Sequence, residues 1–498
     1  MRPKNSPSRS LSELARLLGA EQSFSVDATF TGVSSNSARV IPGDLFIALP
    51  GAKAHGASFV EAALRAGAIA VLTDSEGAEL ISASTAASLP LIVLADLARS
   101  VGDIASWFYN RPSQRMRSIG ITGTNGKTTT ASLISQLLQF QNRNVGVIGT
   151  LGAQIRDLTE QTGFTTPEAC ELQSLFATMV EQGVTDVVME VSSHALALSR
   201  IVGTHFDLVG FSNLTQDHLD FHGDMESYFA AKKKLFTFEY AELGFVNIDT
   251  DFGKRLVGES EIPVQTLSKG NKEADWHFAA IENTATGYRV SIRGVGGILI
   301  EGEIALLGEH NLDNLLMAVA ISVTNEVDPL AVGVDLMRLQ AAPGRLERVA
   351  PHHGVVAVVD YAHTPDAVDH ALATLKARTT GKLIAILGCG GDRDATKRPI
   401  MGARLVSGSD IAIMTSDNPR SESPAEILHQ MAGEFEPSDR LYIEEDRRKA
   451  IALAVTLAEP GDCIALLGKG HETGQLISGV KYPFDDREEL VRALEVLG

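Results

Sequence analysis

A glycine-rich stretch at residues 119–129, IGITGTNGKTT, constrains the fold of this chain more than any other feature. It has the pattern of an apolar strand, a glycine loop and a helix that opens on Lys127 and successive threonines. In such a loop, backbone N–H groups surround phosphate oxygens, the lysine reaches the β- and γ-phosphates, and the first hydroxyl can ligate Mg²⁺. Ile121 stands where the usual loop carries its first glycine, so this loop is a shortened variant. The order of its parts predicts a parallel α/β sheet that binds a nucleoside triphosphate, and disfavours a plain glycine turn beside an exposed lysine.

Apolar strand-like runs alternate with helical stretches along the whole chain, which predicts three α/β domains. A polar segment around Pro112 and the pair Pro343-Gly344 are the natural breaks. The expected domains are an N-terminal one at 1–112, a central one at 113–342 and a C-terminal one at 343–498.

The glycine loop places a P-loop ATPase-type parallel sheet in the central domain. Residues 276–306 alternate polar and apolar side chains between turn residues, which predicts an antiparallel appendage to that sheet. After residue 343 a further series of buried strands and helices predicts a Rossmann-like C-terminal domain.

Composition excludes several classes of function. Lys and Arg total 43 against 62 Asp and Glu, a net charge of −19, so no nucleic-acid partner is expected. The three cysteines form no CxxC pair, which fits a reducing compartment. The N-terminal segment lacks the apolar core of a signal peptide, and no apolar run reaches the roughly 18 residues that a bilayer requires. We expect a cytoplasmic protein without membrane insertion.

Further motifs follow the glycine loop in a fixed order: MEVSSH (189–194), NLTQDHLDFHG (213–223), AAKKKLF (230–236), EHNLDN (309–314), PGRLE (343–347) and VDYAHTP (359–365). Together with GTNGKTT they resemble the Mur ligases of peptidoglycan synthesis and their folylpolyglutamate synthase relatives, over nearly the whole chain. The resemblance implies an ATP-dependent ligase of three domains that forms an amide bond through an acyl phosphate. We expect a monomer.

Making an acyl phosphate brings a carboxylate and a triphosphate together, so the site needs Mg²⁺ and cationic side chains. Glu190 ends an apolar strand, where its carboxylate can hold the metal beside Thr128. By resemblance, His218 contributes to a second metal position, and Lys232 is carbamylated to N6-carboxylysine. Lys232 has apolar neighbours in a lysine run that would otherwise be a solvated face. The expected catalytic residues are Lys127, Glu190, His218 and Lys232, and the expected metal ligands are Thr128, Glu190, His218 and carbamylated Lys232.

The resemblance also implies which residues bind ATP and which bind the UDP-muramoyl dipeptide. The residues expected at ATP are Gly123, Thr124, Asn125, Gly126, Lys127, Thr128, Thr129, Asn311, Asn314, Arg345 and Asp360. Those expected at a UDP-muramoyl dipeptide are Ser35, Ser37, Thr165, Thr166, Ser192 and Arg200, with residues 52–54 where the family wraps the uridine. Asn36 and Ala38 depart from the D-S-R pattern of the family's uridine segment, and Arg39 could compensate for the missing arginine.

The amine substrate is inferred from the motif Asp417-Asn418-Pro419-Arg420, which follows an apolar strand. Ligands of open α/β sheets bind at such strand ends. The motif resembles that of diaminopimelate-adding members, and a guanidinium suits the second carboxylate of meso-diaminopimelate, which L-lysine lacks. The residues expected at this substrate are Arg393, Asp417, Asn418, Pro419, Arg420, Gly468 and Glu472.

The expected reaction therefore adds meso-diaminopimelate to the D-glutamate side-chain carboxylate of UDP-N-acetylmuramoyl-L-alanyl-D-glutamate. The alternatives are the same ligase with L-lysine and, more distantly, a folylpolyglutamate synthase-like ligase. From other classes, a phosphotransferase would release a phosphorylated acceptor, and a nucleotide-binding scaffold would show no turnover.

Overall fold

The computed structural model describes residues 1–19, 27–51, 54–82, 85, 90–284, 286–352 and 354–496. Its contacts divide the chain into two compact units. Unit 1 comprises Met1–His277, Arg293–Ile298 and Leu316–Asp328, and unit 2 comprises Phe278–Ile292, Leu299–Leu315 and Pro329–Gly498. The mixed α/β architecture predicted from the sequence is confirmed, while the domain boundaries at residues 112 and 342 stay predictions.

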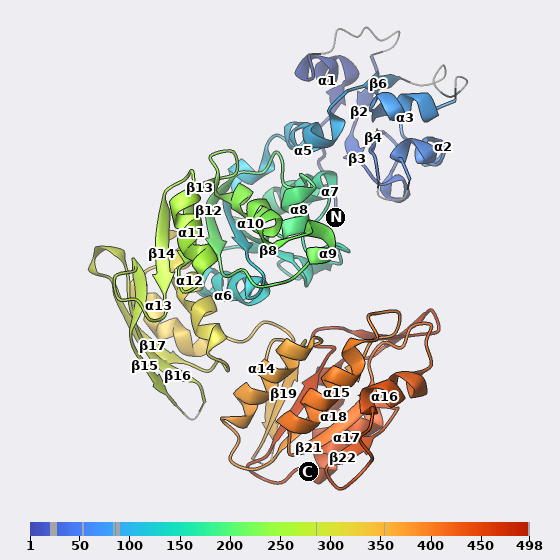
Figure 1. The fold of residues 1–498 in the computed structure, drawn as a ribbon. Coiled ribbons are helices and arrows are strands. Elements are labelled where there is room, and N and C mark those ends of the chain that lie inside the picture. Colours follow the sequence, from blue (N-terminus) through green and yellow to red (C-terminus); the bar gives the residue numbers. More distant parts are fainter. Residues whose placement is uncertain are drawn as a thin grey trace. The chain divides into compact units, whose positions relative to one another are not determined.

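Unit 1 begins with a small parallel sheet, in the order β3 (Gly32–Ser34), β4 (Asp44–Ala48), β5 (Ala70–Thr73) and β6 (Leu91–Val93). A short antiparallel pair, β1 (Arg9–Ser10) and β2 (Thr29–Phe30), precedes this sheet in the sequence. The helices of this part are α1 (Leu11–Leu17), α2 (Val60–Arg65), α3 (Ser75–Leu80) and α5 (Leu97–Phe108) (Figure 1). All residues of β4 and β5 are buried, as expected of parallel strands covered on both faces.

The larger sheet of unit 1 carries the glycine loop. Its parallel strands lie in the order β8 (Val145–Gly149), β11 (Asp186–Glu190), β7 (Arg117–Thr122), β12 (Phe206–Phe211), β13 (Ala241–Asn247) and β14 (Val264–Ser268). β9 (Gly152–Ile155) and β10 (Leu158–Glu160) extend the β8 edge as antiparallel strands. The associated helices are α6 (Lys127–Phe140), α7 (Ala169–Glu181), α8 (Ser193–Ala197), α9 (Leu219–His222), α10 (Met225–Lys233) and α11 (Asp251–Glu259). The central position of β7 places the loop that follows it between the ends of β11 and β12.

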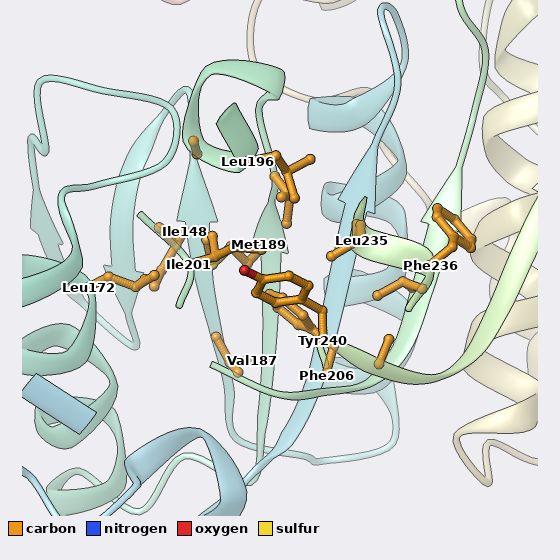
Figure 2. Close-up of a cluster of buried hydrophobic side chains, with 14 of the residues drawn as sticks. Ile148, Leu172, Val187, Met189, Leu196, Ile201, Phe206, Leu235, Phe236 and Tyr240 are labelled. Atoms are coloured by element: carbon orange, nitrogen blue, oxygen red, sulfur yellow. The ribbon is translucent and has the colours of Figure 1, made fainter. Parts of the chain in front are cut away.

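A hydrophobic cluster holds this sheet to its helices. Figure 2 shows side chains from β8, β11 and β12 meeting side chains from α7, α8 and the 3₁₀ turn η4 (Lys234–Phe236). Its labelled members are Ile148, Leu172, Val187, Met189, Leu196, Ile201, Phe206, Leu235, Phe236 and Tyr240. Fully burying one such side chain stabilises the fold by about 1.5–3 kcal/mol. The sheet that carries the glycine loop is therefore well packed against its helices.

The strands β15 (Trp276–Asn283), β16 (Tyr288–Arg293) and β17 (Leu299–Ile304) are successive neighbours in one sheet. Strands joined by connections this short are antiparallel, so the antiparallel appendage predicted at 276–306 is confirmed. The helices that follow are α12 (His310–Thr324) and α13 (Pro329–Asp335).

Unit 2 contains a second sheet, in the order β18 (Glu347–His352), β19 (Val355–Asp360), β23 (Cys463–Leu467), β20 (Leu383–Cys389), β21 (Ile411–Ser416) and β22 (Leu441–Ile443). All neighbours are parallel except β18, which is antiparallel to β19. The helices are α14 (Pro365–Lys376), α15 (Lys397–Gly408), α16 (Pro424–Ala432), α17 (Arg447–Leu457) and α18 (Asp486–Val496), and β24 (Gly474–Ile477) pairs with β25 (Val480–Pro483) as a hairpin. Because β19, β23, β20 and β21 are adjacent and parallel, the loops after them meet at one edge.

No helix in the described part of the chain is both long and apolar enough to cross a bilayer.

Candidate active site

The glycine loop follows β7 and wraps the first turn of α6. Gly123 has φ +145°, and a Cβ there would lie 1.9 Å from Ser212 Oγ, so only glycine fits this close approach. The loop is tied to the end of β12, because Thr124 N donates to Asn213 O at 2.9 Å and Asn125 N donates to Asn213 Oδ1 at 3.0 Å. Lys127 Nζ lies over the loop and donates to Gly123 O, also at 2.9 Å. The loop thus holds a cation and a helix N-terminus together, which is the arrangement that phosphate requires.

Glu190 ends β11 and is almost completely buried. Its carboxylate accepts a hydrogen bond from Thr128 Oγ1 at 3.0 Å, one from Thr150 Oγ1 at 3.1 Å and one from Thr150 N at 2.9 Å. The structure therefore brings together the glutamate and the threonine that were predicted as metal ligands. A carboxylate beside a threonine hydroxyl is the hard-oxygen donor set that Mg²⁺ prefers, so these residues fit the metal that the sequence implies. Within the described ranges, no three His, Cys, Asp or Glu side chains converge on a point that could hold a metal ion.

Lys232 lies on α10 and is buried, unlike the exposed or half-buried lysines that follow it in the run. Its Nζ donates to Gly123 O at 2.8 Å, the same carbonyl oxygen that receives Lys127. Burial, and next the charge of Lys127, lower the pKa of Lys232 well below its ordinary value. A buried amine with a lowered pKa has a larger neutral fraction at neutral pH, which is the form that reacts with CO₂.

His218 occupies a left-handed turn, with φ +53°, immediately before α9. Its ring is about half exposed, lies 4.7 Å from the ring of His194 and 6.3 Å from that of Tyr228, and its Nε2 is 3.4 Å from Asp217 Oδ2. Tyr228 in turn hydrogen-bonds Thr124 Oγ1 at 3.1 Å. His218 and Lys232 thus border the glycine loop through Tyr228 and Gly123, whereas Thr128 meets Glu190 directly.

The residues predicted at the peptide end of the acceptor gather near Glu190. Thr166 is fully buried, and its hydroxyl donates to Glu190 O at 2.8 Å and accepts from Ser192 N at 3.0 Å. Ser192 caps α8, and Thr165 Oγ1 lies 3.3 Å from Thr150 Oγ1. Arg200 pairs with Glu168 at 2.8 Å and stacks on Phe164 at 4.3 Å. Their roles toward a substrate stay predictions.

The predicted uridine segment follows β3. Ser35 and Ser37 are half-buried on either side of Asn36, whose Oδ1 accepts from Ala38 N at 3.0 Å and caps a 3₁₀ turn at Ser37–Arg39. Asparagine and aspartate cap helices equally well, so the Asn36 departure preserves the local fold. Arg39 is 3.5 Å from Glu160 and also pairs with Glu171, so its guanidinium is engaged by two acidic side chains. Residues 52 and 53 lie outside the described residues.

The remaining predicted nucleotide residues lie in unit 2. Asn311 and Asn314 are buried one helical turn apart on α12, and Asn314 Nδ2 donates to Asn311 Oδ1 at 2.9 Å. Asp360 ends β19, where its carboxylate accepts from Leu346 N at 2.7 Å and from Ala362 N at 2.8 Å. Burial raises the pKa of Asp360, although both of these amides and Arg345 oppose that shift.

The loops after β20 and β21 bring the two predicted arginines together. Both arginines lie close to Gly390, since a Cβ at that position would be 2.9 Å from Arg420 Nη1 and 3.7 Å from Arg393 Cγ. Arg420 adopts φ +54°, and its Nη1 donates to Gly391 O at 2.5 Å, while Pro419 O packs on Gly391. The Arg420 guanidinium therefore lies at this sheet edge with Arg393 nearby, and a guanidinium is a group that binds carboxylates.

Next to the arginines lies an acidic group. Asn418 Nδ2 donates to Asp417 Oδ1 at 2.8 Å and to Glu472 Oε2 at 2.7 Å. Gly468, with φ +106°, comes close to Asp417, since a Cβ there would be 3.0 Å from its Oδ2. The edge formed by β23, β20 and β21 therefore presents cationic and anionic side chains side by side, as a zwitterionic amino acid requires.

Sequence reasoning missed Thr150, Tyr228 and Lys469. Thr150 contacts Glu190 across 40 positions of the chain, and no motif marks it. Tyr228 lies one helical turn before Lys232 on α10, a spacing that could have identified it. Lys469 stands inside the Gly468–Glu472 motif, where nothing in the sequence indicates that its side chain is buried.

Comparisons with known proteins identify one family along the chain. Family profiles described as "Mur ligase family, catalytic domain", "Mur ligase middle domain" and "Mur ligase, glutamate ligase domain" match residues 29–109, 121–322 and 344–470. A UDP-N-acetylmuramoyl-L-alanyl-D-glutamate–2,6-diaminopimelate ligase of Streptomyces avermitilis is 45% identical over 99% of this chain and 98% of its own.

Solved structures resemble this chain in fold as well. A UDP-N-acetylmuramoyl-L-alanyl-D-glutamate–2,6-diaminopimelate ligase is 32% identical, with a TM-score of 0.71 over 98% of this chain and 99% of its own. Folylpolyglutamate synthase of Mycobacterium tuberculosis in complex with ADP and AMPPCP shares the fold at 19% identity, with a TM-score of 0.60 over 74% of this chain and 92% of its own.

Proposed function

This chain belongs to the Mur ligase family, and we propose that it joins meso-diaminopimelate to the D-glutamate side-chain carboxylate of UDP-N-acetylmuramoyl-L-alanyl-D-glutamate, with ATP converted to ADP and phosphate. The observation that carries the proposal is the edge of β23, β20 and β21, where Arg393 and Arg420 both lie near Gly390 and where Asn418, two residues before Arg420, donates to Glu472. A diamino dicarboxylic acid offers a distal carboxylate to the guanidinium groups and a distal ammonium to the carboxylate. L-Lysine offers only the ammonium.

The glycine loop serves the first half of the reaction. A carboxylate oxygen of D-glutamate attacks the γ-phosphorus, ADP leaves, and an acyl phosphate forms. Lys127 neutralises charge on the transferred phosphoryl group, and the loop amides hold the phosphates in place. Thr128 and Glu190 would hold Mg²⁺, which when bound neutralises phosphate charge and lowers the repulsion between the two anions.

The second half of the reaction uses the amine subsite. The amine of diaminopimelate attacks the acyl carbon, and the tetrahedral intermediate releases phosphate as the nitrogen loses its proton. Arg420 and Glu472 fix the far end of the substrate, so that only one of its two amines reaches the acyl carbon. We propose the remaining assigned residues in the roles given by the sequence, including carbamylation of Lys232.

The test is phosphate release with ATP, Mg²⁺ and the UDP-muramoyl dipeptide, with meso-diaminopimelate or L-lysine as the amine and mass spectrometry of the product. We expect turnover with diaminopimelate. Turnover with lysine alone would keep the ligase and discard the role of Arg420, and phosphorylated acceptor as the end product would identify a phosphotransferase.

The matched variants are R420A and R404A, the second an exposed arginine on α15. Hydrogen bonds to charged groups contribute about 1.5–3 kcal/mol, so R420A should raise the KM for diaminopimelate roughly 10- to 150-fold. The KM for ATP should stay near the wild-type value, and R404A should match the wild type in both. An equal rise in both KM values for R420A would count against its assigned role.

Cytoplasmic location and a monomeric state also belong to this proposal. Sedimentation of the purified protein tests the second, and a dimer at micromolar concentration would overturn it.

A further inference from the structure

Lys469 lies beneath the proposed amine subsite and is fully buried, with 0% of its surface exposed. Its Nζ donates to Gly474 O at 2.8 Å, to Glu472 Oε2 at 3.2 Å and to Asn418 Oδ1 at 3.5 Å. A side chain this deep has no free surface for a substrate. Its effect on the subsite must therefore pass through the groups that it contacts.

One of those groups is the Asn418 side chain, whose hydrogen-bonding capacity is used within the protein. Its Nδ2 donates to Asp417 and Glu472, and its Oδ1 accepts from Lys469 and from Leu476 N at 2.9 Å. An amide has two donors and two acceptor lone pairs, so all four are occupied. Lys469 and Leu476 N together therefore fix which way the Asn418 amide faces, and that orientation directs an N–H group at Glu472.

The charges of the group do not balance. Lys469 Nζ is 3.6 Å from Asp417 Oδ1 and 3.2 Å from Glu472 Oε2, so one cation faces two carboxylates. Arg447 pairs with Asp486 at 2.6 Å and its charge also acts on Asp417, so including this pair gives two cations and three carboxylates, with one negative charge in excess. Asp417 is buried, whereas the Glu472 side chain is 33% exposed, so the excess negative charge faces outward at Glu472. A substrate ammonium at that point would complete the balance.

We propose that Lys469 is a positioning residue for the amine substrate: it holds the Glu472 carboxylate and the Asn418 amide in the arrangement that receives the distal ammonium. This role rests on the proposed function. The alternative is a purely structural one, in which Lys469 only keeps the loop folded. The two roles predict different effects on ATP binding. Gly468 N donates to Asp360 O at 3.1 Å, which connects the loop of Lys469 to the proposed nucleotide residues. Loss of the loop would disturb ATP, whereas loss of positioning would not.

The experiment compares K469M with K481M, the same change at an exposed lysine on β25 of the neighbouring hairpin. We expect K469M to raise the KM for meso-diaminopimelate on the order of 10-fold, with the KM for ATP within about twofold of wild type. K481M should match the wild type, and K469R, which keeps the charge and the donors, should recover part of the loss. An unchanged KM for diaminopimelate, or an equal rise in both KM values, would overturn the proposal.

A double-mutant cycle with E472Q tests whether Lys469 acts through Glu472. If it does, K469M should add little to the defect of E472Q, whereas full additivity would overturn the proposal. If K469M does not fold, K469Q takes its place under the same criteria, and failure of both to keep the wild-type KM for ATP would assign Lys469 a structural role. No wild-type turnover with any amine would reject the proposed function itself, while turnover unaffected by K469M would reject the Lys469 role alone.

Discussion

At the scale of single residues, Lys232 has the clearest conflict between stability and function. Because its pKa is lowered by burial and by Lys127, the folded state binds its proton less tightly than the unfolded chain does. Stability is therefore lost as pH falls below the ordinary lysine pKa, and recovered as pH rises toward it. K232M removes the loss of folding stability that comes from burying this amine. In bicarbonate-free buffer we expect its melting temperature to exceed that of the wild type at pH 7, with a smaller gap at pH 9, and we expect no turnover.

The control is K233M, at a lysine that is partly exposed and pairs with Glu259 at 2.8 Å. It should keep both activity and melting temperature near the wild-type values. A K232M protein that melts lower than wild type at both pH values would contradict the account, because it would show that the buried amine is a net stabilising group.

The same residue shows what sequence can reveal at this scale. The apolar neighbours of Lys232 predicted that one lysine of the run points inward, and the structure places it in the interior. Asn36 departs from the expected aspartate, yet its capping hydrogen bond follows from the chemistry that the two side chains share. The contact of Thr150 with Glu190 could not be predicted, because it depends on the register of β8 against β11.

At the scale of elements, the glycine loop makes a sharp prediction. Alanine at Gly123 would place Cβ 1.9 Å from Ser212 Oγ, whereas alanine at Gly163, which also has positive φ (+75°), meets no atom within 4 Å. Both substitutions strain the backbone, at about 1–3 kcal/mol, but only G123A also displaces the loop. We expect G123A to lose the rise in melting temperature that ATP with Mg²⁺ gives to the wild type, and G163A to keep it. If the two variants gave the same rise in melting temperature with ATP and Mg²⁺, backbone strain alone would account for the effect of G123A.

Elements differed in how far they could be predicted. The buried parallel strands β8, β11, β12 and β13 were evident as apolar runs, because parallel strands are covered on both faces. The β9–β10 hairpin was missed. Its strands are short, and β10 is exposed or half-exposed throughout, so no period-two pattern develops.

At the scale of the whole molecule, the proposed amine subsite depends on strand order. The motifs at 390–394, 417–420 and 468–472 come from distant parts of the sequence, and they meet because β23 lies next to β20 and β20 next to β21. Each motif could be assigned to the end of a parallel strand from the sequence. That the last of these strands inserts between β19 and β20 could not, since strand order is a property of the assembled sheet.

A buried ion pair between Arg447 and Asp486 contacts the ends of β21 and β23. Arg447 and Asp486 both have 0% side-chain exposure, and Arg447 also donates to Ser416 O at 3.4 Å and to Leu467 O at 3.1 Å. It thereby links α17 and α18 to the last residues of β21 and β23. Neutralising one partner of a buried pair leaves the other charge uncompensated, at a cost of about 3–5 kcal/mol.

We therefore expect D486N to lower the unfolding free energy of unit 2 by roughly that amount, while E488Q, which alters an exposed pair with Arg492 on the same helix, should cost less than about 1 kcal/mol. A chain of several domains does not unfold in one step, so the measurement is hydrogen exchange of the β21 and β23 amides. Protection should fall there in D486N and stay unchanged in β7 and β11 of unit 1. Equal losses in both units would mean that the pair stabilises the chain as a whole, and would remove the reason for treating the carboxyl edge of this sheet as an independently supported site.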